Sequence, residues 1–347
     1  MKTRSTFRHL ILTAILLLLP TVAHAGNWFN GTVSNSVGTR NYKLWIPSSY
    51  TGKKALPLVM MLHGCTQSPD DFAAGTRMNA IADKENFLVV YPEQPVSANA
   101  LKCWNWFDAA NQSRGQGEPL LLAEMISRIS GSYKVDPRRV FVAGVSAGGA
   151  MAVIMGATYP ELFAAIGVHS GLAYKAATNL SEARPAMAKG GADPSHLGDL
   201  AFQAMGKRQH VMRVIVFQGA KDASVAVLNA DQVIAQWART NDYLDDGKEN
   251  NSVDSAGSRR LEGTISGYAF TRYLYNDHAG KPIMEKWIVQ DLKHAWSGGA
   301  AGASYSDPKG PDASREMWRF FKQSRPLATK SKKRHLEGPP LLCLLGE

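Results

Sequence analysis

The sequence predicts an α/β fold in which helices cover both faces of a mostly parallel central sheet. Three observations lead to this prediction. Continuous apolar runs such as PLVMML at 57–62 are typical of strands that are buried on both faces. Such runs alternate along the chain with segments of helical character, as in repeated strand–helix–strand units. The segment VFVAGVSAGGAM at 140–151 has the pattern of a strand, a tight turn and a helix in direct succession.

The elements follow from the same patterns. We expect strands in chain order as an antiparallel edge pair within 31–47, then at 57–62, 87–91, 140–143, 164–168, 211–217, 263–275 and 284–291. We expect helices from Ser68 onward, at 119–133, after residue 146, near 197–207, at 225–240 and at 312–322. Ser68 is the expected N-cap of its helix because Pro69 follows it at the first helical position.

Length and composition predict one domain of the larger α/β type, or one with a small appendage, and we place the catalytic domain at residues 26–325. The chain has 347 residues, of which 45% are hydrophobic and 20% charged, and it contains no visible repeat. Its formal net charge is +10, but some of that charge lies in a basic segment that includes Lys330, Lys332, Lys333 and Arg334. No basic face is interleaved with aromatic residues, so we do not expect nucleic-acid binding. We interpret residues 326–347 as a disordered basic tail.

The first 25 residues have the pattern of an export signal. A basic head with Lys2, Arg4 and Arg8 precedes an apolar run at 10–19, which is too short to span a bilayer comfortably. Ala23-His24-Ala25 then provides a small-x-small cleavage site. An uncleaved N-terminal anchor is the alternative. We expect cleavage near Ala25, export to the periplasm or the medium, and no stable membrane anchor.

Four polar side chains directly follow predicted strands: His63, Ser146, Asp222 and His294. Ligands of open α/β sheets bind at the carboxyl ends of the strands. We therefore expect these side chains to share one site.

The turn Gly144-Val145-Ser146-Ala147-Gly148 matches the G-x-S-x-G pattern of a nucleophile elbow. A serine hydroxyl becomes a nucleophile only when a base takes its proton, and the base needs a third group to orient it. In this type of fold the chain order is serine, acid, histidine. Asp222 and His294 fit that order, so we predict Ser146, Asp222 and His294 as the catalytic residues.

Other histidines and aspartates fit less well. We interpret His169 as a core histidine, because it precedes every plausible acid in the chain. His196 and His210 lie in irregular sequence, and His278 lies in an expected hairpin turn. The remaining acids lack a preceding strand and are expected on the solvated surface; they are Asp193, Asp199 and Asp231.

A tetrahedral intermediate needs two backbone N–H donors for its oxyanion. We predict Ala147, next to the nucleophile, and Cys65, in the loop after the strand at 57–62. Cys65 and Cys103 both lie in loops that follow strands and form the plausible disulfide pair, with Cys343 left over. The alternative for Cys65 is a merely buried thiol. No Cys/His spacing matches a metal-ligand pattern, so we expect neither a metal nor a cofactor.

Five segments together resemble one known family: LHGCTQSPDDFA, CWNWF, GVSAGGAM, FQGAKDASV and LKHAWSGG. Over residues 30–322 the chain is similar to the short-chain-length polyhydroxyalkanoate, or poly(3-hydroxybutyrate), depolymerases. These are α/β-hydrolases related to secreted feruloyl and acetylxylan esterases. The resemblance implies an α/β-hydrolase catalytic domain, a Ser146–Asp222–His294 triad, an oxyanion hole at Cys65 and Ala147, and a Cys65–Cys103 bridge.

The resemblance also implies the substrate. We expect a secreted serine esterase that hydrolyses poly(3-hydroxybutyrate) or another short-chain polyhydroxyalkanoate through an acyl-enzyme. A feruloyl or acetylxylan esterase that acts on plant polysaccharide is the alternative. A non-catalytic binding protein on the same scaffold would need none of the predicted catalytic groups. Secreted polymer-degrading members usually carry a further polymer-binding domain after a linker, whereas this chain ends soon after its last helix. We therefore expect amorphous polymer, oligomers and small esters as substrates.

Aromatic side chains lie in loops that should reach the same end of the sheet. An apolar acyl group needs apolar walls, so we predict that Trp104, Trp106 and Trp296 line an acyl cleft. The alternative is that these aromatics only pack the loops together.

Overall fold

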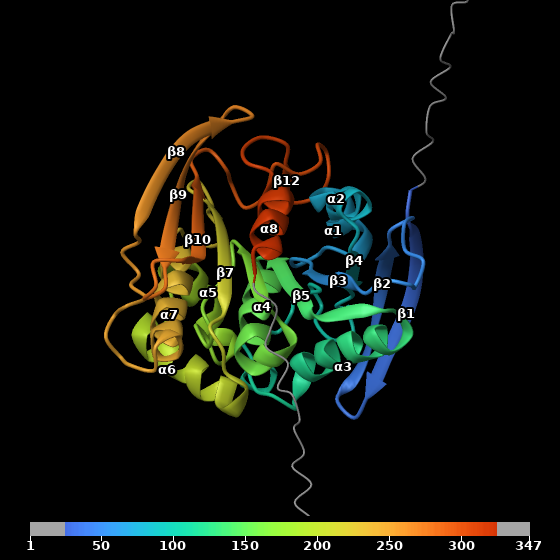
Figure 1. The fold of residues 1–347 in the computed structure, drawn as a ribbon, viewed down its shortest axis with the longest axis horizontal. Coiled ribbons are helices and arrows are strands. Elements are labelled where there is room, and N and C mark those ends of the chain that lie inside the picture. Colours follow the sequence, from blue (N-terminus) through green and yellow to red (C-terminus); the bar gives the residue numbers. More distant parts are fainter. Residues whose placement is uncertain (1–24, 325–347) are drawn as a thin grey trace, which may run out of the picture.

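A computed structural model of the chain describes residues 25–324 (Figure 1). The predicted export signal and the predicted tail at 326–347 lie outside the described residues, apart from Ala25 itself. Nearly all strands belong to one ten-stranded sheet in the order β1-β2-β4-β3-β5-β6-β7-β10-β9-β8. Neighbours from β4 to β10 in this order run parallel, and the outer pairs on both sides run antiparallel. The predicted mostly parallel sheet is therefore confirmed.

The strands have the following bounds: β1 Asn27–Asn35, β2 Gly38–Ile46, β3 Leu56–Leu62, β4 Leu88–Pro92, β5 Val135–Val145, β6 Ala165–His169, β7 Arg213–Gly219, β8 Arg259–Ile265, β9 Tyr268–Asn276, β10 Pro282–Val289, β11 Trp296–Ser297 and β12 Ser306–Asp307. The α-helices are α1 Pro69–Thr76, α2 Met78–Glu85, α3 Gly117–Ser132, α4 Ala147–Thr158, α5 Leu180–Lys189, α6 Pro194–Met205, α7 Leu228–Asp245 and α8 Ala313–Lys322.

Helices cover both faces of the sheet, as predicted (Figure 1). One apolar cluster joins the sheet to α3, α4, α6 and α7, and a second joins it to α1, α2 and α8. Strand β3 shows why its whole run is apolar. Leu58, Met60 and Leu62 face the first cluster, while Val59 and Met61 face the second. The parallel strands are thus held in the centre with their carboxyl ends along one rim.

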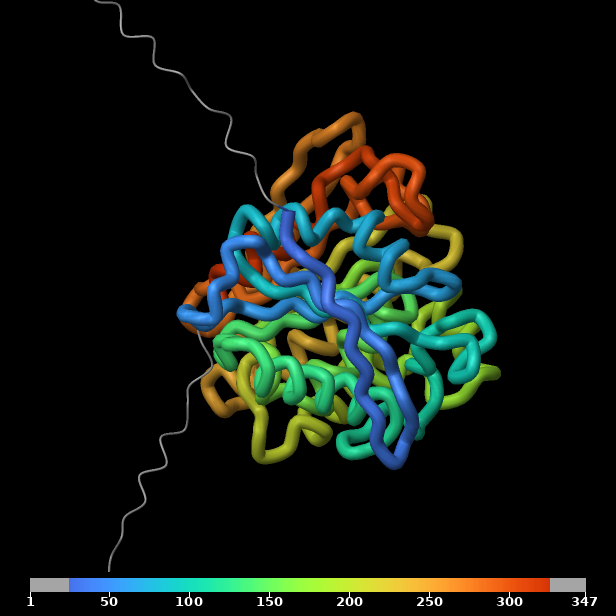
Figure 2. Tube along the Cα trace, turned by 90° about the vertical axis from the view of Figure 1, so that its right-hand side faces the viewer, coloured from blue at the N-terminus to red at the C-terminus, as the bar shows by residue number. Residues whose placement is uncertain are grey.

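The two edges of the sheet are hairpins. Figure 2 shows the β1–β2 hairpin crossing one edge, where the sequence predicts it. At the other edge the prediction of one strand at 263–275 is wrong, because the chain turns at Ser266-Gly267 and forms β8 and β9. Both turn residues have positive φ, of 46° and 87°, which a two-residue hairpin turn requires. Ser266-Gly267 is a recognised turn dipeptide, and the prediction of a single strand overlooked it.

Helix boundaries agree with the patterns where local chemistry fixes them. Ser68 caps α1 by accepting a hydrogen bond from the Asp71 N–H, and Pro69 occupies the first turn. Helices α2 and α5 were not expected; α5 contains Pro185 and lies in sequence that reads as irregular. Within residues 25–324, no helix combines the length and apolar character needed to cross a bilayer.

Candidate active site

Ser146 lies at the sharp turn between β5 and α4. Its φ and ψ are 57° and −121°, a conformation that costs a side-chain-bearing residue about 1–3 kcal/mol. The flanking glycines permit this turn. A Cβ on Gly148 would lie 2.1 Å from the carbonyl oxygen of Leu62, and one on Gly144 would lie 2.3 Å from the carbonyl oxygen of Gly148. The Ser146 N–H donates to the carbonyl oxygen of His169 at 2.9 Å, which ties the turn to β6.

The predicted acid and base meet at the carboxyl ends of two neighbouring strands. Asp222 follows β7 and His294 follows β10, and these strands pair in parallel. The Nδ1 of His294 lies 2.8 Å from Oδ2 of Asp222, which also accepts from the side-chain amide of Gln218 at 3.1 Å. The other carboxylate oxygen accepts the N–H groups of Ser224 and Val225 at 2.9 and 2.8 Å. The carboxylate is therefore held on both oxygens.

This arrangement keeps Asp222 ionised. Burial raises the pKa of the Asp222 carboxyl, but the hydrogen bonds and charge of His294 and the N–H of Val225 outweigh burial, so the net pKa lies below its usual value. An ionised Asp222 fixes the tautomer of His294 with its proton on Nδ1. The Nε2 atom of His294 is then free to accept a proton.

A small pocket brings these elements together. It has a volume of about 170 Å³, and Ser146 and His294 both line it. Cys65, Met187 and Tyr305 complete much of its wall. The structure thus brings the predicted nucleophile, base and oxyanion loop to one hollow, with Asp222 behind the base.

The predicted disulfide between Cys65 and Cys103 is present and joins the loop after β3 to the loop after β4. Around it, backbone donors are mostly occupied. The Gly64 N–H donates to Gln67 at 2.9 Å, and the Thr66 N–H donates to the carbonyl oxygen of Leu101 at 2.6 Å. Among the described residues, no acceptor is paired with the N–H of Cys65 or of Ala147. These two donors are the ones predicted for the oxyanion hole.

Two further histidines support the site without sharing its chemistry. His63 is buried, its Nε2 accepts the Gln94 N–H at 3.0 Å, and its Nδ1 lies 2.7 Å from the carbonyl oxygen of Gly64. Burial lowers the pKa of His63 to about 4 and that of His169 to about 3. Nε2 of His169 accepts the Ser297 N–H at 3.1 Å. Both imidazoles are neutral loop anchors, which agrees with the interpretation of His169 as a core residue.

The structure corrects the predicted acyl-cleft residues. Trp104, Trp106 and Trp296 are 0%, 4% and 1% exposed, and none of them lines the pocket beside Ser146. Trp104 and Trp106 pack into one apolar cluster and Trp296 into the other, where its indole N–H donates to Ser314. The loops that carry these tryptophans do reach the correct rim, but the large rings turn inward because the core beneath the loops buries more apolar surface.

Sequence reasoning missed the apolar residues that do line the pocket, Met187 and Tyr305. Met187 lies in the unpredicted helix α5, and Tyr305 lies in the irregular loop between β11 and β12. A single methionine or tyrosine in irregular sequence carries no periodic signal. Only the tertiary arrangement identifies these side chains.

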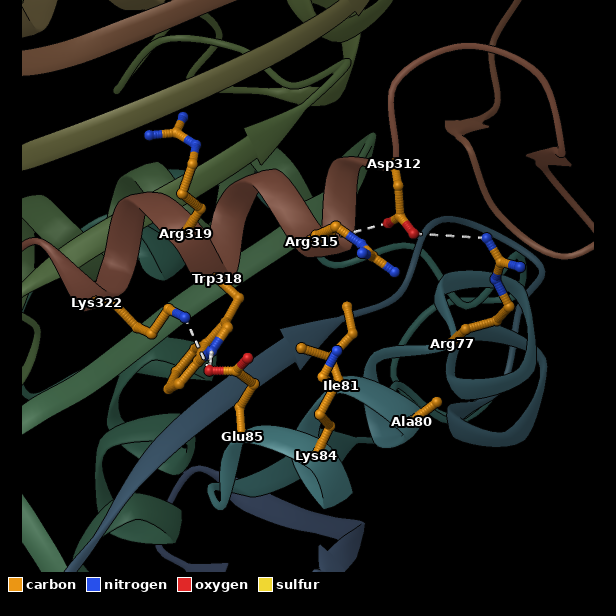
Figure 3. A pocket seen from close by; sticks show the side chains of 10 residues that line it. All are labelled: Arg77, Ala80, Ile81, Lys84, Glu85, Asp312, Arg315, Trp318, Arg319 and Lys322. Carbon is orange, nitrogen blue, oxygen red and sulfur yellow. Dashed lines mark hydrogen bonds and ion pairs between the residues drawn. The ribbon is translucent and has the colours of Figure 1, made fainter. Parts of the chain in front are cut away.

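A larger hollow of about 370 Å³ lies elsewhere, between α2 and α8 (Figure 3). Arg77 and Asp312 lie at one end of it, and Glu85 pairs with Lys322 beside Trp318 at the other. It contains none of the predicted catalytic residues. Within residues 25–324, no group of three or more His, Cys, Asp or Glu side chains is arranged to hold a metal ion.

Comparison with known proteins identifies the family of this chain. The sequence model of the family described as "Esterase PHB depolymerase" matches residues 40–262. Poly(3-hydroxyalkanoate) depolymerase C of Paucimonas lemoignei is 33% identical over 69% of this chain, and the chain spans about half of that protein's length, 54%. Feruloyl esterase B of Neurospora crassa is 29% identical over 78% of this chain and 88% of its own length.

A solved structure shares the fold. The acetyl xylan esterase from Aspergillus awamori superposes with a TM-score of 0.66 at 19% identity, covering 85% of this chain and 99% of its own. The family match extends over more than half of the chain and contains the elbow, Asp222 and the disulfide. The chain therefore belongs to the PHB depolymerase family of esterases, which are carboxylic-ester hydrolases with the α/β-hydrolase fold.

Proposed function

We propose that this protein is an exported serine esterase that cleaves short-chain polyhydroxyalkanoates, poly(3-hydroxybutyrate) above all, through an acyl-enzyme. The observation that carries the proposal is the strained Ser146, which shares its pocket with a histidine held by a buried, ionised Asp222. This backbone conformation lowers the stability of the fold. Strained residues of this kind cluster at active sites, where the strain is part of the mechanism.

Acylation begins when Oγ of Ser146 attacks the ester carbonyl carbon and Nε2 of His294 takes the hydroxyl proton. Asp222 stabilises the imidazolium that forms. The carbonyl oxygen becomes an oxyanion and accepts hydrogen bonds from the N–H groups of Cys65 and Ala147. When the intermediate collapses, the C–O bond breaks and His294 returns the proton to the departing alcohol.

Deacylation repeats these steps with water. The oxygen of a water molecule attacks the acyl carbon while His294 takes a proton from that water. The second tetrahedral intermediate expels Oγ of Ser146, which recovers its proton from His294. The products are a carboxylic acid, an alcohol and the free enzyme, so no cofactor is required.

Two apolar side chains of the pocket support a polyester substrate. Met187 and Tyr305 line the pocket beside Ser146, and Tyr305 is 45% exposed. Small-molecule sites are lined mostly by apolar and aromatic side chains, so these two favour an apolar acyl chain. One relative is named as a poly(3-hydroxyalkanoate) depolymerase and another as a poly(3-hydroxybutyrate) depolymerase.

A feruloyl or acetylxylan esterase is the second candidate. The observation that favours it is coverage, because this chain matches 88% of the length of a feruloyl esterase but 54% of a depolymerase.

Export is supported by the signal pattern of residues 1–25 and by the Cys65–Cys103 disulfide, since such bonds persist in oxidising compartments.

The test pairs two substrates with one variant. Mature protein should clear a poly(3-hydroxybutyrate) emulsion and release soluble hydroxy acids, and it should release little ferulate from arabinoxylan. Ser146→Ala should lower kcat on p-nitrophenyl butyrate by about 10⁵–10⁶-fold. Ferulate release without clearing would transfer the assignment to the second candidate. Full activity in Ser146→Ala would remove both.

A further inference from the structure

A buried carboxylate that does not touch the pocket is connected to the oxyanion loop. Glu118 lies in the first turn of α3, is 3% exposed, and pairs with Arg40 of β2 at 3.4 Å. Its oxygens accept the N–H and the side-chain amide of Asn105, both at 2.8 Å, and the side-chain amide of Gln94. Burying an ion pair costs desolvation, so this one is weak as a device for stability alone.

Gln94 extends the connection toward the site. Its side chain is completely buried and accepts from Arg40 at 2.8 Å, while its amide donates to Glu118 and to the carbonyl oxygen of Cys103 at 2.9 Å. Its backbone N–H donates to His63. Arg40, Gln94, Asn105 and Glu118 thus form one network, which we call the loop clamp.

The loop clamp reaches Cys65 by two routes. On the first, it holds Cys103 through Gln94, and the disulfide passes that constraint to Cys65. On the second, Gln94 orients His63, whose Nδ1 contacts the carbonyl oxygen of Gly64, the residue before Cys65. Both routes end at the backbone N–H that would bind the oxyanion.

We propose that Glu118 is a positioning residue that aligns the Cys65 N–H with the oxyanion of the ester transition state, through the loop clamp. This inference rests on the proposed function. Glu118 does not contact substrate. Its carboxylate only accepts hydrogen bonds, and it receives N–H groups from both sides of the Cys103 loop at once.

The two acceptor oxygens of Glu118 matter for this role. Burial raises the pKa of its carboxyl, and the hydrogen bonds from Gln94 and Asn105 and the charge of Arg40 offset only part of that shift. A glutamine at 118 would have nearly the same shape but would offer one acceptor oxygen and an NH₂ group. At least one of the Gln94 and Asn105 donors would then face another donor, and the loop would have to shift. A displacement of about 1 Å in a group that stabilises the transition state costs on the order of 100-fold in rate.

The experiment compares Glu118→Gln with Glu285→Gln as a matched control. Glu285 is another buried carboxylate, 2% exposed, and holds Arg272 and Arg319 at 2.6 Å each on β10, outside the pocket lining. We expect Glu118→Gln to lower kcat on p-nitrophenyl butyrate by about 10- to 100-fold while KM changes less than about 3-fold. Glu285→Gln should lower the midpoint of urea unfolding but keep kcat within about 2-fold.

A transition-state mimic separates positioning from general destabilisation. Oγ of Ser146 adds to the boron of butylboronic acid while Nε2 of His294 takes the hydroxyl proton. In the tetrahedral boronate that forms, one boronate oxygen occupies the place of the oxyanion. The Kd of butylboronic acid should rise in Glu118→Gln by the same factor by which kcat/KM falls. It should stay unchanged in Glu285→Gln. If Glu118→Gln does not fold, Asn105→Ala removes one arm of the loop clamp and should show the same pattern more weakly.

Two results would contradict different claims. A folded Glu118→Gln variant with normal kcat and normal boronate affinity would overturn the positioning role and leave the esterase proposal standing. Full activity in Ser146→Ala, measured alongside, would instead remove the proposed function.

Discussion

The two halves of the candidate site are held in different ways. On the side of β3, β5 and α4, the backbone itself is fixed. Gly148 packs against Leu62, Ser146 has a positive φ, and a disulfide holds Cys65. On the side of β7 and β10, the backbone follows ordinary strand ends, and side-chain hydrogen bonds between Asp222 and His294 set the geometry. The nucleophile half thus depends on a strained backbone at Ser146, whereas the base half depends on the charge of Asp222.

This difference predicts how each half fails. Changes on the base side should cost much more rate than stability, because the charge that they remove acts most strongly on the protonated imidazole. Changes on the nucleophile side should affect stability as well as rate, because they alter a backbone that the core has forced into place.

Asp222→Asn should have the largest effect among tests of the comparison. Asparagine retains an acceptor for the Ser224 and Val225 N–H groups but loses the charge that stabilises the His294 imidazolium. We expect kcat to fall by about 10⁴-fold, as it does in serine proteases. Unfolding free energy should fall by only about 1–3 kcal/mol, because the new NH₂ group faces the side-chain amide of Gln218. Steady-state kinetics and urea unfolding check both expectations.

Asp136→Asn is the matched control. Asp136 is a 7% exposed carboxylate on β5 that pairs with Arg138 and Arg139, outside the pocket lining. It should lose stability and keep kcat. If kcat fell no further in Asp222→Asn than in Asp136→Asn, the base half would not depend on the charge of Asp222.

Removal of the disulfide should have a moderate effect on both rate and stability. We expect Cys103→Ser to lower kcat by about 10-fold, because the Thr66 N–H still bonds to the carbonyl oxygen of Leu101 and keeps the two loops together. Stability should fall by about 2–4 kcal/mol. Kinetics and urea unfolding with and without dithiothreitol measure both, and an unchanged kcat would show that Cys65 needs no covalent support.

The sequence predicts the nucleophile half well because its chemistry is local. Gly144, Ser146 and Gly148 must be close in sequence to make the turn, so a short motif contains them. The base half was predictable by a different rule, since Asp222 and His294 each follow a strand and the strand ends share a rim. What links them is topology, which the alternation of strands and helices already implies.

Other features depend on contacts between distant segments and left no local signal. An acidic residue in the first turn of a helix is ordinary, so Glu118 reads as a residue that favours the helix dipole rather than as a clamp for Asn105. Trp104 and Trp296 were predicted at the correct rim but in the wrong orientation. Whether a loop aromatic faces a substrate or the core is decided by the free volume beneath the loop.

Acidification should weaken the protein through its two buried histidines. An unfolded histidine has a pKa near 6.5, whereas His63 and His169 have pKa values of about 4 and about 3. Between these values the unfolded chain binds more protons than the native state. Stability is therefore fully present above about pH 6.5 and is lost as pH falls toward 4, by an amount on the order of a few kcal/mol.

Urea unfolding at pH 7.5, 5.5 and 4.5 measures this slope. His169→Gln should unfold more easily at pH 7.5 but lose less further stability on acidification. Equal slopes in the wild type and in His169→Gln would assign acid sensitivity to other groups.

The smallest effect isolates the strain at the elbow. At φ 57° and ψ −121°, glycine has no Cβ to conflict with its neighbours, whereas alanine keeps the conflict of serine. Among inactive variants, Ser146→Gly should therefore be more stable than Ser146→Ala by about 1 kcal/mol. The same pair at Ser127, an exposed position in the interior of α3, should show the opposite sign, because glycine inside a helix costs about 1 kcal/mol relative to alanine. If glycine were the less stable residue at both positions, the core would not be imposing strain on Ser146, and the two halves of the site would be held in the same way.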